Sequence, residues 1–171
     1  MKTPPVPPDE RERLETLRRL AILDTPRADP FDRVTRTCAR MLGVPIVLVS
    51  LVDEERQWFK SRVGLDVPET SREVAFCAHV VHARRSLVVP DALEDERFAD
   101  NPLVTGAPHV RAYLGVPVRA PHGHALGTLC AIDRSPRDFT APQVLAMERM
   151  AHVVEQLIRT MHAAAEPVLP G

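Results

Sequence analysis

An almost uninterrupted apolar run at residues 44–52, rich in valine, is the feature that most constrains how this chain folds. A run of this length is too short to cross a membrane and is typical of a strand buried on both faces. A polar turn at 53–56 and a second β-favouring segment at 57–63 follow it, which predicts a hairpin. With 171 residues and 44% apolar content, the chain can form one core around the resulting sheet.

Helix signals lie on both sides of this hairpin. Leu14, Leu17, Leu20 and Ala21 recur three and four residues apart and predict a first helix that begins after Asp9. Asp29 is expected to cap a second helix, with Pro30 in its first turn and Gly43 at its end. A capping box that starts at Thr70 predicts a third helix directly after it.

The second half of the chain alternates short strand signals with turn residues. Segments 86–89, 111–119 and 125–133 are expected to be strands, and the last two are close enough to form a hairpin. Segment 90–108 is expected to be a loop with one helical turn. This element order predicts an α+β fold in which helices cover a mainly antiparallel sheet.

A final helix is predicted from a capping box formed by Thr140 and Gln143. Its apolar residues then recur at steps of three and four: Val144, Met147, Ala151, Val154, Ile158 and Met161. This stripe is either the packing face of the helix within the domain or the seam of a homodimer, and a wide face serves both purposes.

The two ends of the chain are expected to lie outside the domain. Prolines crowd residues 1–8 and predict a disordered arm, while residues 164–171 are expected to form a short tail, which leaves a single domain over 9–163. The sequence has no apolar stretch suited to a secretory signal or a membrane span. We therefore expect a cytoplasmic protein with no membrane partner.

Charge and cysteine content argue against several other classes. Lysine and arginine number 22 against 23 acidic residues, so no basic block is available to bind a run of phosphates, and nucleic acid is not an expected partner. The cysteines are three in number and form no C-x-x-C pair, so neither a disulfide framework nor a zinc knuckle is indicated. They are expected to be reduced thiols.

Short motifs from residue 23 to residue 133 carry a family resemblance. They are LDTP at 23–26, VSLVD at 49–53, RQWFKS at 56–61, FCAH at 76–79 and GTLCAID at 127–133. In this order and spacing the chain resembles, over roughly residues 10–162, the GAF domains of bacterial signalling proteins.

The resemblance implies a GAF/PAS-like fold and a sensory function. The implied fold is a six-stranded antiparallel sheet with the terminal helices on one face and a small-molecule pocket on the other. The helix around Phe76 and the loop after Pro90 would roof this pocket. Relatives of this kind usually regulate an attached output domain; since no such segment is recognisable here, a downstream signalling protein is an expected partner. Neither the ligand nor any cofactor is identified by the resemblance.

Candidate ligand-binding residues are aromatic, sulfur-containing or polar side chains in strands, near strand ends, or in the roofing segments. They are Trp58, Phe76, Cys77, His79, Asp91, Asn101, Arg111, Tyr113, Cys130 and Asp133. Cys77 and His79 lie two positions apart on a helix and therefore point in different directions, so no metal site is expected. Strict alternation places Cys130 on the same side of its strand as Leu126 and Thr128, without showing which face of the sheet that is.

The residues provide no evident set of nucleophile, base and orienting group, so a binding module is expected rather than an enzyme. One alternative is a thiol-based reductase similar to the GAF-type reductases of free methionine sulfoxide. The wide separation of Cys77 and Cys130 in the sequence argues against it. A bilin photoreceptor is disfavoured because Ala78 separates Cys77 from His79. The other alternative is a dimerisation module without a ligand.

Overall fold

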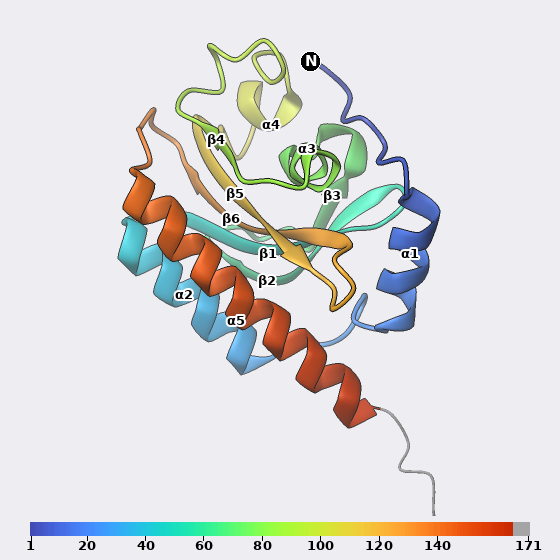
Figure 1. Cartoon of the computed structure of the whole chain (residues 1–171). Helices are drawn as coiled ribbons and strands as arrows, with labels where there is room; N and C mark the ends of the chain where they lie inside the picture. The colour runs from blue at the N-terminus through green and yellow to red at the C-terminus, as the bar shows by residue number, and fades with distance from the viewer. Residues whose placement is uncertain (166–171) are drawn as a thin grey trace, which may run out of the picture.

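A single six-stranded antiparallel sheet forms the centre of the molecule, in the strand order β3-β2-β1-β6-β5-β4 (Figure 1). The computed structural model describes residues 1–165. The strands are β1 Ile46–Val52, β2 Arg56–Val63, β3 Glu69–Ser71, β4 Leu87–Val89, β5 Ala112–Arg119 and β6 Ala125–Asp133. Both predicted hairpins are confirmed, and β1 and β6 join them side by side, so the apolar run lies at the centre of the sheet.

Helices cover both faces of this sheet. They are α1 Glu10–Arg19, α2 Asp29–Leu42, the 3-10 turn η1 Arg72–Val74, α3 Phe76–Ala83, α4 Pro102–Thr105 and α5 Ala141–Ala165. Helices α2 and α5 lie together on one face, α3 and α4 lie on the other, and α1 stands at one edge, apart from the α2–α5 pair (Figure 1). The α+β fold is confirmed, with one apolar cluster on each side of the sheet.

Two predicted helix starts differ from the structure. Ala28, not Asp29, occupies the N-cap of α2. The capping box at Thr70 starts no α-helix, because residues 69–71 pair with β2 as strand β3 and the Ser71 side chain caps only the turn η1. Sheet hydrogen bonds therefore take precedence over the local helix signal, and α3 begins at Phe76.

The motifs LDTP and RQWFKS contact each other in the structure. Arg56 donates to both carboxylate oxygens of Asp24, and the nearly buried Lys60 ammonium donates to the Thr25 hydroxyl at 2.9 Å and to the Pro26 carbonyl at 2.6 Å. A lysine buried in this way requires such partners. The two motifs thus fasten the α1–α2 connection to strand β2.

The apolar stripe of α5 is used inside the domain. Met147, Ala151, Val154 and Ile158 are buried in the cluster that contains α2 and β5, and Val144 and Met161 pack against its edge. The capping box is confirmed, since Thr140 and Gln143 exchange hydrogen bonds. The stripe therefore serves as the packing face of the helix within the domain. Leu17, on the apolar face of α1, is buried in the same cluster.

The expectation of a disordered arm at residues 1–8 is wrong in this structure. Pro4 and Pro7 are buried, the Lys2 amide donates to the Arg97 carbonyl at 3.0 Å, and the terminal amine pairs with Asp100. The arm therefore packs against the segment between β4 and α4. At the other end α5 continues to Ala165, and the rest of the expected tail, 166–171, lies outside the described residues.

A buried ion pair anchors α1 beside the first residues of β6. Arg13 is 1% exposed and donates to Glu10 at 2.7 Å, while its Nη1 lies 3.5 Å from the carbonyl oxygens of Ala125 and Leu126. Arg72 donates to the same Glu10 carboxylate. Burial alone raises the pKa of Glu10, but the hydrogen bonds from the two arginines outweigh it and lower that pKa.

Replacing Glu10 by glutamine is expected to destabilise the domain by about 2 kcal/mol at pH 7, because two arginines lose their charged partner; partial exposure keeps the loss below that of a fully buried pair. A carboxylate with a lowered folded-state pKa stabilises the fold above its unfolded pKa, and this contribution disappears as pH falls through the folded-state value. The difference between E10Q and wild type should therefore shrink towards pH 3. Urea unfolding at both pH values measures it. Glu12, exposed on the same helix, provides the control E12Q, and an equal loss in both variants would contradict the assignment.

Candidate functional site

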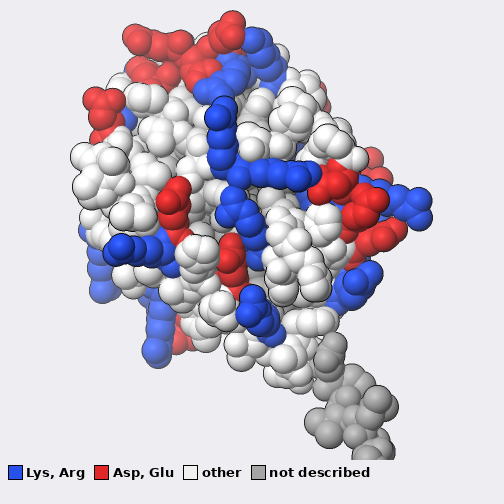
Figure 2. All heavy atoms as spheres, in the orientation of Figure 1, with Lys and Arg blue, Asp and Glu red and all other residues white. Residues whose placement is uncertain are grey.

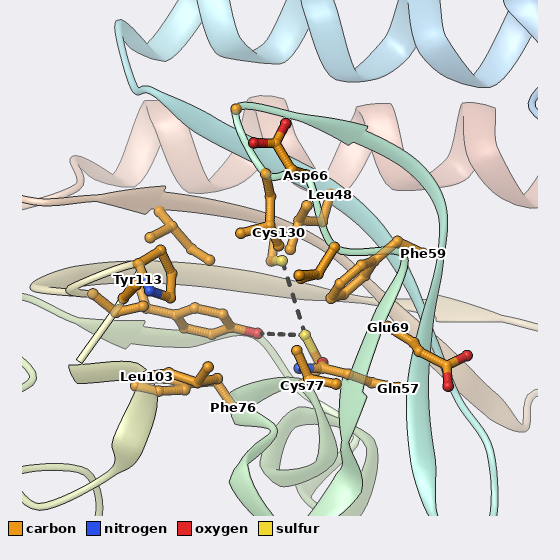
Figure 3. Close-up of a pocket in the computed structure, with 18 of the residues that line it drawn as sticks. Leu48, Gln57, Phe59, Asp66, Glu69, Phe76, Cys77, Leu103, Tyr113 and Cys130 are labelled. Carbon is orange, nitrogen blue, oxygen red and sulfur yellow. Dashed lines mark hydrogen bonds between the residues drawn. The ribbon is translucent and has the colours of Figure 1, made fainter. Parts of the chain in front are cut away.

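A cavity of about 440 Å³ lies on the face of the sheet opposite α2 and α5 (Figure 3). Its floor comes from β1, β2, β5 and β6, one wall from the start of α3, and its mouth from segments 64–70 and 103–110. The lining is mainly apolar and includes Leu48, Phe59, Leu65, Leu103, Val110 and Ile132. A partly open, apolar cavity of this size is typical of a small-molecule site.

A few polar and charged side chains line the cavity and its rim. Gln57, only 4% exposed, accepts a hydrogen bond from Ser50 at 3.1 Å and donates to Thr70 at 2.6 Å. The rim carries the exposed side chains of Asp66, Glu69 and Arg134. The arrangement offers a ligand an apolar surface with a few fixed hydrogen-bonding groups at its edge.

Two cysteines form part of the cavity wall. The sulfur of Cys77, on α3, lies 3.8 Å from the sulfur of Cys130, on β6. The Tyr113 hydroxyl donates to the Cys77 sulfur at 3.3 Å, and the Thr128 hydroxyl donates to it at 3.0 Å. In Figure 3 the Tyr113 hydroxyl and the Cys130 sulfur both approach Cys77 from the sheet.

These contacts shift the pKa values of the two thiols in opposite directions. Burial raises the pKa of the Cys77 thiol, but hydrogen bonds from Cys130, Thr128 and Tyr113 to its sulfur outweigh burial and lower the pKa. At Cys130 the hydrogen bond to Cys77 and then burial raise the pKa well above its usual value. Cys77 is therefore the more acidic thiol of the pair.

Aromatic packing fixes α3 over the sheet. Phe76 stacks on Phe98 with ring centroids 4.0 Å apart and lies 5.0 Å from the Tyr113 ring. A Cβ atom at Gly115 would lie 2.2 Å from the Tyr113 hydroxyl oxygen, so glycine at this position makes room for the tyrosine ring. Burial raises the pKa of Tyr113, which keeps its hydroxyl protonated as a donor to Cys77.

Four of the ten sequence-predicted ligand residues line the cavity: Phe76, Cys77, Tyr113 and Cys130. The structure thus shows which face Cys130 occupies. Leu126, expected on the same side as Cys130, instead packs in the opposite cluster with α2 and α5. The register between β5 and β6 shifts at this point, and such a bulge breaks the strict alternation.

Three of the remaining candidates lie in packing contacts elsewhere. Trp58 is buried in the cluster on the helix-covered face. His79 lies edge-on to Phe98, and burial and the neighbouring Arg97 lower its pKa. Asn101 caps α4 by accepting from the Leu103 amide and ties it to η1 by donating to the Val74 carbonyl.

The other three candidates make local ion pairs or turn contacts. Arg111 and Asp91 form a two-fold hydrogen-bonded pair at 2.8 and 2.7 Å. Asp133 accepts from the Ser135 amide at 3.1 Å and from Arg137 at 3.3 Å. Within residues 1–165, these six residues are not among those that line the cavity beside the thiol pair.

The sequence reasoning missed the polar residues of the site. Ser50 and Thr128 are buried polar side chains in otherwise apolar strands, and Gln57 is buried in β2, which mixes polar and apolar residues. A polar residue that interrupts an apolar strand was the available signal, because burying such a group requires a partner.

No group of three or more metal-ligating side chains occurs within residues 1–165, and no helix there is long and apolar enough to span a bilayer. On the face shown in Figure 2, basic and acidic side chains are interspersed. A hollow beside α5 contains Arg84, Arg85 and Arg119, but Glu148 and Glu155 line it too. The hollow therefore carries both signs of charge.

An antiparallel six-stranded sheet with paired helices on one face and a cavity on the other defines the GAF/PAS-like class of α+β domains. The GAF domain family model matches residues 26–158, and the chain belongs to this family. It is 38% identical, over 164 residues and 95% of its length, to a Pseudomonas aeruginosa protein named cyclic di-GMP phosphodiesterase PA2567. The chain spans only 28% of that relative.

Solved structures share the fold at low sequence identity. The GAF domain of an Acinetobacter phosphoenolpyruvate-protein phosphotransferase has a TM-score of 0.67 at 22% identity, covering 90% of this chain and 96% of that one. The free methionine-R-sulfoxide reductase of Neisseria meningitidis, in complex with its substrate, has a TM-score of 0.68 at 17% identity, with 91% coverage of both chains. At these identities the similarity establishes the fold alone.

Proposed function

We propose that this GAF domain is a sensory module of a signalling system and that it binds a small organic molecule in the cavity opposite α2 and α5. The observation that carries the proposal is the cavity of about 440 Å³, whose lining is mainly apolar and includes a few polar groups. A core without a ligand would be expected to pack such a space with side chains.

The lining indicates the ligand class. Leu48, Phe59 and Ile132 favour an apolar body, while Gln57 and Thr70 offer hydrogen bonds to one polar end. The charged residues stand only at the rim, so a compact, largely uncharged metabolite fits better than a multiply charged nucleotide.

The relative named as a cyclic di-GMP phosphodiesterase suggests the signalling context. We propose that the chain works in the cytoplasm and that ligand binding to it regulates an effector of this kind. The effector is either a domain attached to the chain or a separate partner protein. The phosphodiesterase activity itself is a property of a protein of which this chain matches 28%.

A Val110→Phe substitution is expected to weaken ligand binding by at least about tenfold, because the added ring occupies space in the cavity that Val110 lines. Val153→Phe, the same exchange on the exposed side of α5, is the matched control and should leave binding unchanged. A thermal-shift screen of metabolites on the wild-type protein identifies the ligand, and titration calorimetry on the three proteins measures its affinity. Absence of any stabilising metabolite, or equal affinity of V110F and wild type, would contradict the proposal.

The thiol pair supports a second candidate function, a reductase of a small sulfoxide. Cys77 and Cys130 are far apart in the sequence, which argued against this function. In the structure their sulfurs lie 3.8 Å apart in the cavity wall, so that argument no longer applies. In such a reaction the two thiols become a disulfide, and the sulfoxide oxygen leaves as water. Turnover of free methionine sulfoxide with a thioredoxin system tests this candidate.

A further inference from the structure

We propose that Cys77 and Cys130 form a reversible, peroxide-reactive dithiol, in which Cys77 is oxidised first and Cys130 resolves it to an intramolecular disulfide. The inference adds an oxidant-modified site to the sensory domain. It does not depend on the proposed ligand, because both sulfurs belong to the chain itself and lie 3.8 Å apart.

The geometry brings the two sulfurs close to bonding distance. Their separation is 3.8 Å, and a disulfide requires about 2.0 Å. The two residues come from different elements, with Cys77 in the first turn of α3 and Cys130 in β6 beneath it. A modest rotation of the two side chains or a small shift of α3 therefore closes the bond.

The surroundings assign different roles to the two sulfurs. The Tyr113 and Thr128 hydroxyls both donate to Cys77 and stabilise it as the thiolate, which is the form that attacks a peroxide. Cys130 keeps its proton and lies next to the sulfur that becomes oxidised. This is the arrangement of a peroxide-reactive cysteine beside its resolving partner.

Access to the pair is limited to small molecules. Cys77 is 2% exposed and Cys130 0%, yet both line the cavity that opens at segments 64–70 and 103–110. Hydrogen peroxide is small enough to enter, whereas a bulky thiol or an aromatic disulfide reagent is expected to react slowly.

The chemistry balances with a hydroperoxide as the oxidant. The Cys77 thiolate attacks one peroxide oxygen, the O–O bond breaks, and sulfenic acid and hydroxide form. The Cys130 sulfur then attacks the sulfenic sulfur, the S–O bond breaks, and the Cys130 proton leaves with the hydroxyl as water. Two thiols lose two electrons and two protons in total, and one hydrogen peroxide becomes two waters.

Oxidation would also change the ligand cavity. Closing the S–S bond draws the sulfurs about 1.8 Å closer. It also removes the thiolate that accepts hydrogen bonds from Tyr113 and Thr128, two hydroxyls that would need new partners at the cavity wall.

Cys38 provides an internal control. It is fully buried on α2, in the cluster on the other side of the sheet, and burial raises the pKa of its thiol to about 11. A thiol of this kind is expected to be inert to peroxide.

The test is performed on the whole reduced chain with hydrogen peroxide. After quenching, the protein is denatured, alkylated and mapped by mass spectrometry. The expected result is a loss of two hydrogen atoms, a peptide linking Cys77 to Cys130, and alkylation of Cys38 alone. Treatment with dithiothreitol before alkylation should restore the two hydrogen atoms and allow alkylation of all three cysteines. Alkylation of all three cysteines, equal oxidation of Cys38, or persistent oxidation of Cys77 with Cys130 free would overturn the proposal.

Two substitutions separate the roles of the sulfurs. Cys130→Ala should stop the reaction at a sulfenic acid on Cys77 that dimedone traps, and Cys77→Ala should slow oxidation of Cys130 by at least about tenfold. Cys38→Ala is the matched control and should form the disulfide at the wild-type rate. If either variant of the pair fails to fold, peptide mapping of the wild type still decides the outcome.

Discussion

Replacing Val154 by aspartate is expected to unfold the domain. Val154 is 0% exposed in the middle of the α5 packing face, and a carboxylate there has no partner in the apolar cluster it shares with α2 and β5. Burying an unpaired charge costs several kcal/mol, on the order of half or more of the stability of an ordinary domain. Circular dichroism and urea unfolding of V154D measure the loss.

The neighbouring residue provides a matched control. Val153 is 43% exposed on the same helix. V153D therefore introduces the same charge and the same change in helix propensity, but its carboxylate stays in contact with solvent. Its stability should stay within about 0.5 kcal/mol of wild type. A V154D protein that remains folded and becomes monomeric, with a dimeric wild type, would show instead that the stripe is a seam between subunits.

Replacing Gly127 by valine is expected to cost about 3–5 kcal/mol, a large share of the roughly 5–15 kcal/mol that stabilises an ordinary domain. Even a Cβ atom at this position would lie 1.8 Å from the Ser50 carbonyl oxygen and 2.8 Å from the Leu51 Cα. Gly127 is paired with β1 on one side and with β5 on the other, so neither strand can move away to make room. The backbone contact, not a backbone dihedral, therefore requires glycine.

Gly43 allows the dihedral and steric effects to be separated. It ends α2 at φ +63°, and a Cβ atom there would meet nothing within 4 Å. Gly43→Ala should therefore cost only about 1 kcal/mol, the strain of a left-handed backbone. Thermal unfolding of G127V, G127A and G43A compares them, and equal losses in G127A and G43A would show that the close approach to Ser50 is relieved by small shifts.

The strands and most helices were predictable because their signals are local. Each of these signals depends on residues that are close together in the sequence. The structure confirms the strand in the apolar run at 44–52, the capping box at Thr140 and the helix end at Gly43. The capping box at Thr70 failed because β2 supplies hydrogen-bond partners from outside the local segment.

The site was predictable only in part. Phe76, Cys77, Tyr113 and Cys130 reach the cavity, but Asp91 and Arg111 satisfy each other instead, and Asn101 caps α4. A polar side chain in a loop has several local partners available, so its residue type alone does not show whether a ligand or a neighbour uses it.

The sequence by itself determined the α+β fold, the GAF family and the elements that carry the site. Apolar periodicity and turn residues involve neighbouring positions in the chain, so they can be recognised without the structure. Tertiary structure alone decided which face Cys130 occupies, that α5 packs inward, and that two thiols far apart in the chain lie 3.8 Å from each other. The physical reason is that strand pairing brings distant residues together through backbone hydrogen bonds, which depend little on which side chains the paired residues carry. A single bulge beside Leu126 is enough to change which side chains share a face.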